Sequence, residues 1–510
     1  MEGQNLSEKE LNLEPSFKGF LLQSGFNRIA VAVCFFICVI QIVVFKYYYP
    51  FASFINGDSF EYVQNAFLNA RLDVHPVGYS KFLRLFSIFS TNDTSLVVFQ
   101  YFFVQISIWF FLFSIFYFHE INVWIKYTLL GLLTVNPIIL YMANYISTDA
   151  LFLALSVLWI TSLLWFLHRP SWSLAIIHAF LILLVFMIRY NALYYPIVSL
   201  VAFLGAKAKN NLRIVGVLVG AFLIGGFVLA TSLKYKKLTG VYQFSPFSGW
   251  QIANNGLYIY RGVLPEQRKE LPEKFKELDR EVRMYLDTVR TLEGRFPEIM
   301  LDINAVYMWS PASPLRTFMG KSFKKKPAMD EFQRWSSIAP LYKEYGTTLI
   351  KTYPIAFFKR FLWPNFVKFY SPPVEFLGTY GYNVDTIPAI TKDWFRYRDK
   401  RVTSRFSDVS VNALDYYPII CGTMSAVFIM MSISFFILKG REQERDLFKT
   451  WLLFAVLWVC NMVFSVFASP IALRFQILSL IVSVVIVFVI LDFMLKQGAK
   501  EGKKSDEEIG

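Results

Sequence analysis

Two carboxylates and one histidine in a short polar segment have the types and spacing needed for proton transfer. Asp58 and Glu61 lie three residues apart in the stretch NGDSFEY, which puts both side chains on one face of a helix. His75 follows in the stretch HPVGYSKFL. A positioned carboxylate can take the proton of a hydroxyl group, so Asp58 is the candidate catalytic residue, with Glu61 and His75 as supporting or acceptor-positioning groups. The alternative for Asp58, which follows a glycine, is a helix N-cap.

A third carboxylate and two arginines occur at the ends of apolar runs. Asp149, in the stretch STDALF, stands where the chain re-enters an apolar segment, and an ionisable group there is costly and often functional. Its alternative role is to cap the following helix. Arg189 ends one apolar run and Arg474 stands at the start of the last one. Fixed cations suit a departing phosphate group, while the alternative for either arginine is a snorkelling or packing role.

The composition of the whole chain indicates which elements position these residues. Of 510 residues, 55% are hydrophobic and only 17% charged, whereas soluble domains average about 25% charged residues. This composition excludes a disordered chain, argues against a free cytosolic enzyme, and predicts an all-α polytopic membrane protein with about ten transmembrane helices. The apolar runs are Val31–Phe45, Leu96–Phe118, Tyr127–Ala143, Leu151–Leu167, Leu174–Ile188, Leu193–Leu204, Ile214–Ser232, Pro418–Leu438, Trp451–Phe467 and Ile471–Leu491.

The basic residues of the short connections predict the orientation of these helices. They recur in one set of connections and are absent from the short connections 144–149 and 468–470 of the other set. Short cytoplasmic loops carry the excess of Lys and Arg, so we expect both termini to be cytoplasmic. The candidate site residues then lie on the extracytoplasmic face of the membrane.

The predicted helices divide the chain into four parts. We expect a transmembrane module over residues 1–233 with a first outer loop at 46–95, a large mixed insert over 234–417 between spans seven and eight, transmembrane helices over 418–495, and a cytoplasmic tail over 496–510. The insert contains 29 Lys and Arg against 19 Asp and Glu, which is +10 of the chain's +14. Most positive charge therefore faces away from the cytoplasm, which excludes nucleic acid as a partner and favours membrane lipids and other phosphate-bearing molecules.

Two segments of the insert predict helices. Residues 271–292 are highly charged, with apolar residues at helical spacing, which predicts a surface helix. Residues 352–370 mix aromatic, basic and proline residues, which is typical of an interfacial helix on the lipid headgroups. The sequence has no Walker-type or glycine-rich phosphate loop, which argues against ATP-driven transport.

Four stretches in the first 200 residues together resemble the GT-C superfamily of integral-membrane glycosyltransferases. They are GDSFEY in the first outer loop, HPVGYSKFL after it, TDALF at the start of a later span and RYNALYYP after another. The chain looks most similar to the bacterial branch related to protein mannosyltransferases and lipid A aminoarabinose transferases. The resemblance implies a GT-C-like architecture. It favours the bacterial plasma (inner) membrane, with the endoplasmic reticulum as the alternative.

The resemblance also implies a reaction and roles for the candidate residues. A sugar would pass from a polyprenyl-phosphate donor to a lipid, glycan or protein acceptor on the outer face of the membrane. Asp58 would act as the general base, and Glu61 and Asp149 would support it or bind a divalent metal such as Mg²⁺ or Mn²⁺. Arg189 and Arg474 would bind the donor phosphate. Grooves between the spans would hold the polyprenyl chain.

Two other functions stay open from the sequence. A flippase or transporter for a lipid-linked glycan would use the same apolar spans, although the chain has no inverted repeat of the kind that such carriers often show. A glycan polymerase or ligase would use a lipid-diphosphate donor in place of a monophosphate.

Overall fold

The chain forms a bundle of long helices with a helical domain at one end. The computed structural model describes residues 16–295, 304–406, 409–468 and 470–509, and in these ranges it has helices, loops and three isolated β-bridges. Eight helices of this described part are long and apolar enough to cross a membrane, which confirms a polytopic membrane protein. They are α2 (Gly25–Tyr48), α5 (Asp93–Phe118), the pair α6 (Val123–Thr134) and α7 (Pro137–Asn144), α8 (Thr148–His168), α11 (Asn210–Thr239), α20 (Tyr417–Ile437), α22 (Arg445–Ala468) and α23 (Ile477–Ile509).

The remaining two predicted spans are shorter apolar helices. Helix α9 (Trp172–Ile188) has 17 residues, and α10 (Tyr195–Gly205) has 11 and follows the 3₁₀ turn η1 (Tyr190–Tyr194). At about 1.5 Å per residue, α10 is roughly 17 Å long, which is short of a bilayer core of about 30 Å. Pro196 stands at its start, where a missing backbone N–H costs nothing. The count of ten spans therefore stays a prediction.

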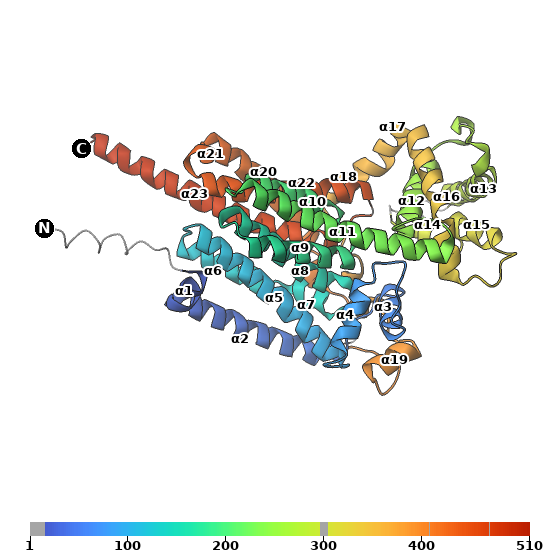
Figure 1. Ribbon diagram of the computed structural model, residues 1–510, viewed down its shortest axis with the longest axis horizontal. Helices are drawn as coiled ribbons and strands as arrows, with labels where there is room; N and C mark the ends of the chain where they lie inside the picture. Colours follow the sequence, from blue (N-terminus) through green and yellow to red (C-terminus); the bar gives the residue numbers. More distant parts are fainter. Residues whose placement is uncertain (1–15, 296–303, 407–408, 469, 510) are drawn as a thin grey trace.

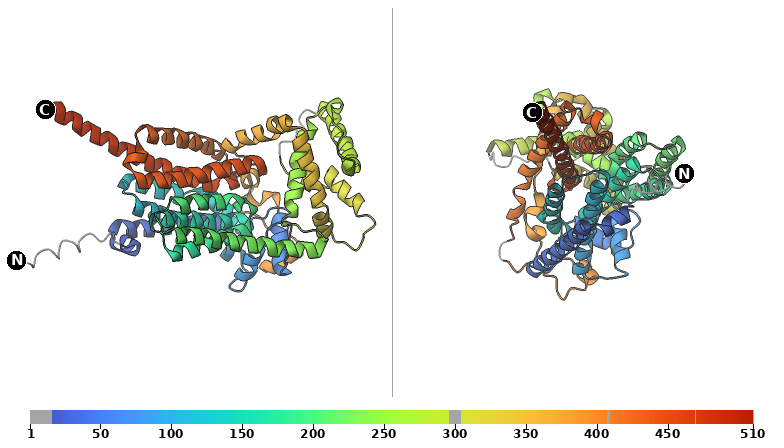
Figure 2. Two further views of the ribbon diagram at one scale, coloured as in Figure 1. Left: turned by 45° about the horizontal axis from the view of Figure 1, so that its top comes forward. Right: turned by 90° about the vertical axis from the view of Figure 1, so that its left-hand side faces the viewer.

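The two ends of the described chain lie at the same end of the bundle. Figure 1 shows α1 (Phe17–Gln23) and the C-terminal end of α23 on the left, and the helices of the insert on the right. The left view in Figure 2 shows the same separation along the long axis. An even number of crossings produces this arrangement. We call the right-hand end, which carries the insert, the insert end.

The insert is built on one tightly packed helix pair. Helix α12 (Pro246–Arg261) lies against α16 (Glu331–Thr352), and α13 (Lys276–Arg295), α14 (Val306–Trp309) and α15 (Pro314–Ser322) surround them. The two backbones touch: a Cβ atom added at Gly249 would lie 2.2 Å from the Ala339 carbonyl oxygen. The insert has a hydrophobic core distinct from that of the bundle, and this core is rich in buried tyrosine and tryptophan.

The structure corrects our expectation that the insert has mixed structure. Its described residues contain helices and two isolated bridges, because their apolar residues recur at helical spacing, as in α12 and α16. The surface helix expected at 271–292 is confirmed as α13. The segment 352–370 folds as α17 (Pro354–Phe357), a π-helical turn (Phe358–Leu362) and α18 (Trp363–Tyr370). Helix α11 runs on to Thr239, so residue 233 lies within a continuous helix.

Candidate functional site

A backbone bridge fastens the first outer loop to the connection before α8. The Ser53 N–H donates to the Asn144 carbonyl at 2.9 Å, and the Ile146 N–H donates to the Ser53 carbonyl at 2.9 Å. The buried Ser59 hydroxyl adds a clamp, since it donates to the Ile146 carbonyl at 2.7 Å and accepts from the Ile55 N–H at 2.8 Å. These bonds hold the segments that carry Asp58 and Asp149 side by side.

Asp58 begins the helix α3 (Asp58–Phe67) with its carboxylate partly open to solvent. The N-cap position belongs to Gly57, whose φ of +89° favours glycine, and no side chain of the described residues caps this helix end. The capping alternative for Asp58 is therefore wrong. Its side chain keeps 33% of its exposure, and Glu61 follows in the same first turn of the helix, as the spacing predicted.

His75 lies beside Asp58, and a glycine packs its segment against the end of α9. The His75 Nε2 atom is 3.6 Å from Asp58 Oδ1, an ion-pair distance longer than a hydrogen bond. Gly78, at the start of α4 (Gly78–Phe86), touches the backbone at Met187, where an added Cβ would lie 2.3 Å from the carbonyl oxygen. This contact brings the His75 segment to the helix end that carries Arg189.

Two arginines share the buried carboxylate of Asp149. Arg189 Nη1 binds Asp149 Oδ1, and Arg474 Nη1 lies 3.5 Å from Asp149 Oδ2, while the Asp149 side chain is only 1% exposed. The Ser147 hydroxyl donates to Asp149 Oδ2 at 2.9 Å and also caps α8. The capping alternative for Asp149 is therefore wrong, and neither arginine snorkels away from the bundle.

Aromatic rings lie against the two guanidinium groups. The ring of Phe475 contacts both, 4.6 Å from the Arg189 guanidinium carbon and 4.5 Å from that of Arg474. Phe152 also faces Arg189, and Phe376 faces Arg474 at 4.6 Å. Stacked guanidinium groups keep their N–H edges directed sideways, the geometry that binds carboxylates and phosphates.

A chain of buried hydrogen bonds connects the two arginine-bearing segments. The Tyr194 hydroxyl donates to Asn461 Oδ1 at 3.1 Å, and Asn461 Nδ2 donates to Gln476 Oε1 at 2.6 Å. Tyr194 ends the turn after Arg189, and Gln476 follows Arg474 by two residues. The bonds through Asn461 on α22 thus set the separation of the two cations.

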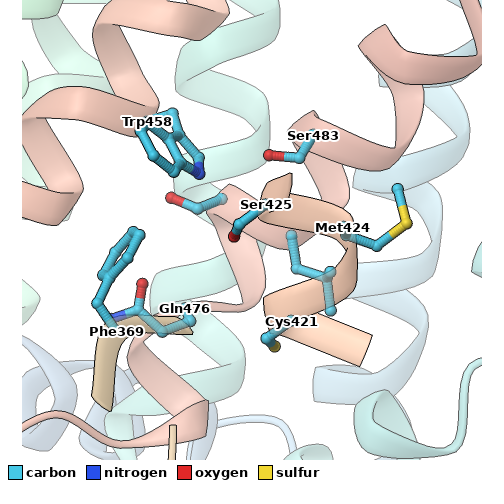
Figure 3. Close-up of a pocket in the computed structure, with 9 residues that line it drawn as sticks. Phe369, Cys421, Met424, Ser425, Trp458, Gln476 and Ser483 are labelled. Carbon is cyan, nitrogen blue, oxygen red and sulfur yellow. The ribbon is translucent and has the colours of Figure 1, made fainter. Parts of the chain in front are cut away.

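A small cavity of mixed polar and apolar lining lies next to these hydrogen bonds. Figure 3 shows Gln476 at its edge, with the hydroxyl groups of Ser425 and Ser483 and the ring of Trp458 around the same space. Its volume of about 10 Å³ is that of one water molecule. The buried Ser479 hydroxyl, which also lines it, has no hydrogen-bond partner among the described residues. A bound water would satisfy that group, and nothing larger would fit.

The charges of this region favour an ionised Asp58. Burial disfavours its charged form, but the neighbouring His75 and the positive charges of Arg474 and Arg189 outweigh burial and hold the pKa of Asp58 below its usual value. Burial also disfavours the charged form of His75, but Asp58, followed by Asp73 and Glu61, raises the pKa of His75 to about 9. Asp58 and His75 thus form an ion pair at neutral pH.

Asp73 is a residue of this region to which the sequence analysis assigned no role. Asp73 is buried, and its negative charge repels that of Glu61. Burial and this repulsion raise the pKa of Glu61. Burial also raises the pKa of Asp73. The pair therefore holds a proton more readily than either carboxyl would alone. Asp73 stands two residues before His75, and this closeness in the sequence could have indicated that it belongs to the same site.

Glu375 is a second residue that the sequence analysis missed. Its Oε2 atom lies 3.5 Å from Arg474 Nε, and burial raises the pKa of Glu375 above its usual value. Its backbone has a φ of +53°, a conformation that is rare for residues other than glycine and often marks functional sites. No local pattern near Glu375 predicts contact with Arg474, because 99 residues separate them along the chain.

The two carboxylates proposed as metal ligands do not fit a divalent cation together. Both oxygens of Asp149 face arginine guanidinium groups, whose positive charge would repel a metal ion. Glu61 interacts with Asp73 and His75, not with Asp149. Within the described residues, no group of three or more His, Cys, Asp or Glu side chains has the arrangement of a metal site.

An apolar cavity of about 460 Å³ lies in the other half of the bundle. Phe17 of α1, Phe110 of α5, Trp165 of α8 and Leu174 of α9 are among its lining residues. These positions belong to the ends of the helices near α1, far from the insert end in Figure 1. This cavity is therefore not a groove that leads to the arginine pair.

Contacts and charges connect all six candidate residues at the insert end of the bundle. Asp58 pairs with His75, and Asp149 joins Arg189 and Arg474. The charges of the two arginines act on Asp58, and the charges of His75 and Asp58 act on Glu61. Comparisons of the chain with models of known families, with curated proteins and with solved structures find no match.

Proposed function

We propose that the protein is a membrane glycosyltransferase that moves a sugar from a polyprenyl-phosphate donor to an acceptor hydroxyl on the outer face of a bacterial plasma membrane. The observation that carries this proposal is a partly exposed, ionised carboxylate, Asp58, in the field of two arginines held by one buried aspartate. A base next to fixed cations is what displacement of a phosphate leaving group requires.

In the proposed reaction, Asp58 removes the proton of the acceptor hydroxyl as its oxygen attacks the anomeric carbon. The new bond joins that oxygen to the sugar, and the bond between the sugar and the phosphate oxygen breaks. Polyprenyl phosphate leaves with the bonding electron pair, and N–H groups of Arg189 and Arg474 offset its charge. Protonated His75 keeps Asp58 ionised until the proton arrives.

The orientation follows from the same proposal. The insert end of the bundle would face the extracytoplasmic side, and both termini would be cytoplasmic, as the basic residues of the short connections predict. The net positive charge of the insert would then attract anionic lipids at the outer surface. The architecture of ten spans in the manner of GT-C enzymes belongs to this proposal.

A transfer assay tests the proposal directly. Purified protein in lipid nanodiscs is mixed with a panel of polyprenyl-phosphate sugars, with the matching polyprenyl-diphosphate sugars, and with saccharide, peptide and lipid acceptors. We expect transfer from a monophosphate donor by the wild type, and a loss of about 100-fold or more in Asp58→Asn. The control Glu266→Gln changes an exposed acid of the insert and should transfer normally.

Three outcomes would overturn the proposal. Transfer from diphosphate donors alone would indicate a polymerase or ligase. Movement of a labelled glycolipid across reconstituted vesicles, with no transfer to any acceptor, would indicate a transporter. Full activity of Asp58→Asn would remove the assigned base.

A further inference from the structure

An exposed tryptophan of the insert lies next to His75. Trp309, the last residue of the short helix α14, keeps 41% of its exposure. Its ring centroid is 6.1 Å from that of His75 and 6.3 Å from that of Phe247, and the Phe247 and His75 rings are 5.6 Å apart. Trp309 and Phe247 therefore form an aromatic surface next to the Asp58 and His75 pair.

Two buried tryptophans hold the Trp309 ring in place. The ring of Trp335 is almost parallel to it, at 10° and a centroid distance of 6.3 Å, and the ring of Trp250 is parallel to Trp335 at 7° and 5.2 Å. Trp250 Nε1 donates to the Trp335 carbonyl at 2.9 Å, which fixes the stack between α12 and α16. Trp309 is the exposed end of this rigid stack, so its ring is positioned before any ligand binds.

The contacts order the groups of the site from cations to aromatic surface. Arg189 and Arg474 act on Asp58, Asp58 pairs with His75, and His75 touches Trp309. If the donor phosphate binds at the arginines, the aromatic surface stays free. A second molecule can then reach Asp58 from the side of His75 and Trp309. Under the proposed reaction, that molecule is the acceptor.

The chemistry of this surface points to a sugar ring as its occupant. One face of a pyranose carries only C–H groups and stacks on a flat indole, while hydroxyl groups at the ring edge stay free to react. An isoprenoid chain would need a long apolar groove, and the neighbours of Trp309 include the charged pair of His75 and Asp58. A membrane-interface anchor would lie at the bilayer surface, whereas α14 packs on α12 within the insert (Figure 1).

We propose that Trp309 is the platform on which a sugar ring of a saccharide acceptor stacks, with one of its hydroxyl groups directed to Asp58. This assignment rests on the function proposed above and narrows its acceptor from lipid, glycan or protein to a saccharide. Trp309 is a specificity-determining residue in it, and His75 orients the bound ring next to the base.

A footprinting experiment tests the platform without requiring catalysis. The wild-type protein in nanodiscs is oxidised by hydroxyl radicals, with and without maltotetraose, cellotetraose or mannotetraose, and oxidation of each tryptophan is read by mass spectrometry. We expect at least one tetrasaccharide to protect Trp309 and none to protect Trp172, which is 52% exposed at the other end of the bundle. Equal oxidation of Trp309 in every sample would overturn the platform, even if the protein transfers sugar.

Kinetics of Trp309 variants supply the second test. In Trp309→Ala, we expect the KM for the saccharide acceptor to rise about tenfold, with kcat and the KM for the donor nearly unchanged. Trp309→Phe keeps an aromatic face and should recover most of the affinity, and Trp172→Ala is the matched control. An unchanged acceptor KM in Trp309→Ala, or transfer only to peptides or lipids, would overturn the saccharide assignment. Protection without any transfer would keep the saccharide site and reject the proposed reaction.

Discussion

Gly78 lies directly against the carbonyl group of Met187. A Cβ atom added at Gly78 would come within 2.3 Å of that oxygen, a distance that real side chains do not adopt. The contact joins the segment of His75 to the end of α9, because Met187 lies two residues before Arg189. The distance between the Asp58 and His75 pair and the two arginines thus depends on the absence of a side chain at Gly78.

Replacement of Gly78 by alanine should therefore damage the site. The new methyl group must push the His75 segment away from Arg189, and a displacement of about 1 Å costs up to roughly 100-fold in rate. Transfer activity measured in nanodiscs should fall by at least about tenfold in Gly78→Ala. The matched control is Gly131→Ala in α6, where no described atom beyond its chain neighbours and its own helical backbone lies within 4 Å of the added Cβ, and activity should be unchanged. Equal activity of both variants would contradict the positioning role of Gly78.

Removal of the polar group of Asn461 should loosen the arginine pair. Asn461→Leu keeps a similar volume but removes the acceptor of the Tyr194 hydroxyl and the donor to Gln476 Oε1, at about 1–3 kcal/mol for each buried group. We expect a lower unfolding temperature and a higher KM for the donor, with the KM for the acceptor little changed. Ser434→Ala, which removes an exposed hydroxyl bonded within α20, is the control and should change neither value. A normal donor KM in Asn461→Leu would show that these bonds do not position the cations.

The Asp58 and His75 pair predicts a pH dependence of stability. The pKa of His75 rises from 6.5 to about 9 on folding, so protonated His75 stabilises the fold fully below pH 6.5, and this contribution is lost as the pH rises through about 9. In His75→Gln, the unfolding temperature should therefore differ most from the wild type below pH 6.5, with the difference shrinking above pH 9. A difference that stays constant, or grows, as the pH rises would contradict the ion pair.

Loss of the charge of Asp149 should affect folding more than loss of the charge of Asp58. Asp149→Asn leaves two half-buried guanidinium groups without their shared, fully buried carboxylate, and removal of one member of a buried ionic group costs about 3–5 kcal/mol. Asp58 keeps a third of its exposure, so Asp58→Asn should unfold close to the wild type while transfer is lost. Urea unfolding followed by circular dichroism compares the two variants, and equal stability of Asp149→Asn and Asp58→Asn would contradict this division of roles.

The sequence alone was enough to predict the membrane class, the long helices and the residues most in need of explanation. Hydrophobicity and run length belong to each segment by itself, so eight of the spans follow without knowledge of packing. Asp149, Arg189 and Arg474 stand out for a similar reason, because an ionisable group at the end of an apolar run is costly wherever the chain folds. The two shorter helices show the limit, since turns and proline divide their apolar run.

Only the tertiary structure decided how these residues act together. Whether Asp58 and Asp149 cap helices was undecided until the structure assigned those positions to Gly57 and Ser147. The roles of Glu375 and Trp309 depend on neighbours far away along the chain, Arg474 and His75, which no local pattern records. The physical reason is that hydropathy is a property of consecutive residues, whereas ion pairs, shared protons and stacked rings arise from the packing of distant segments.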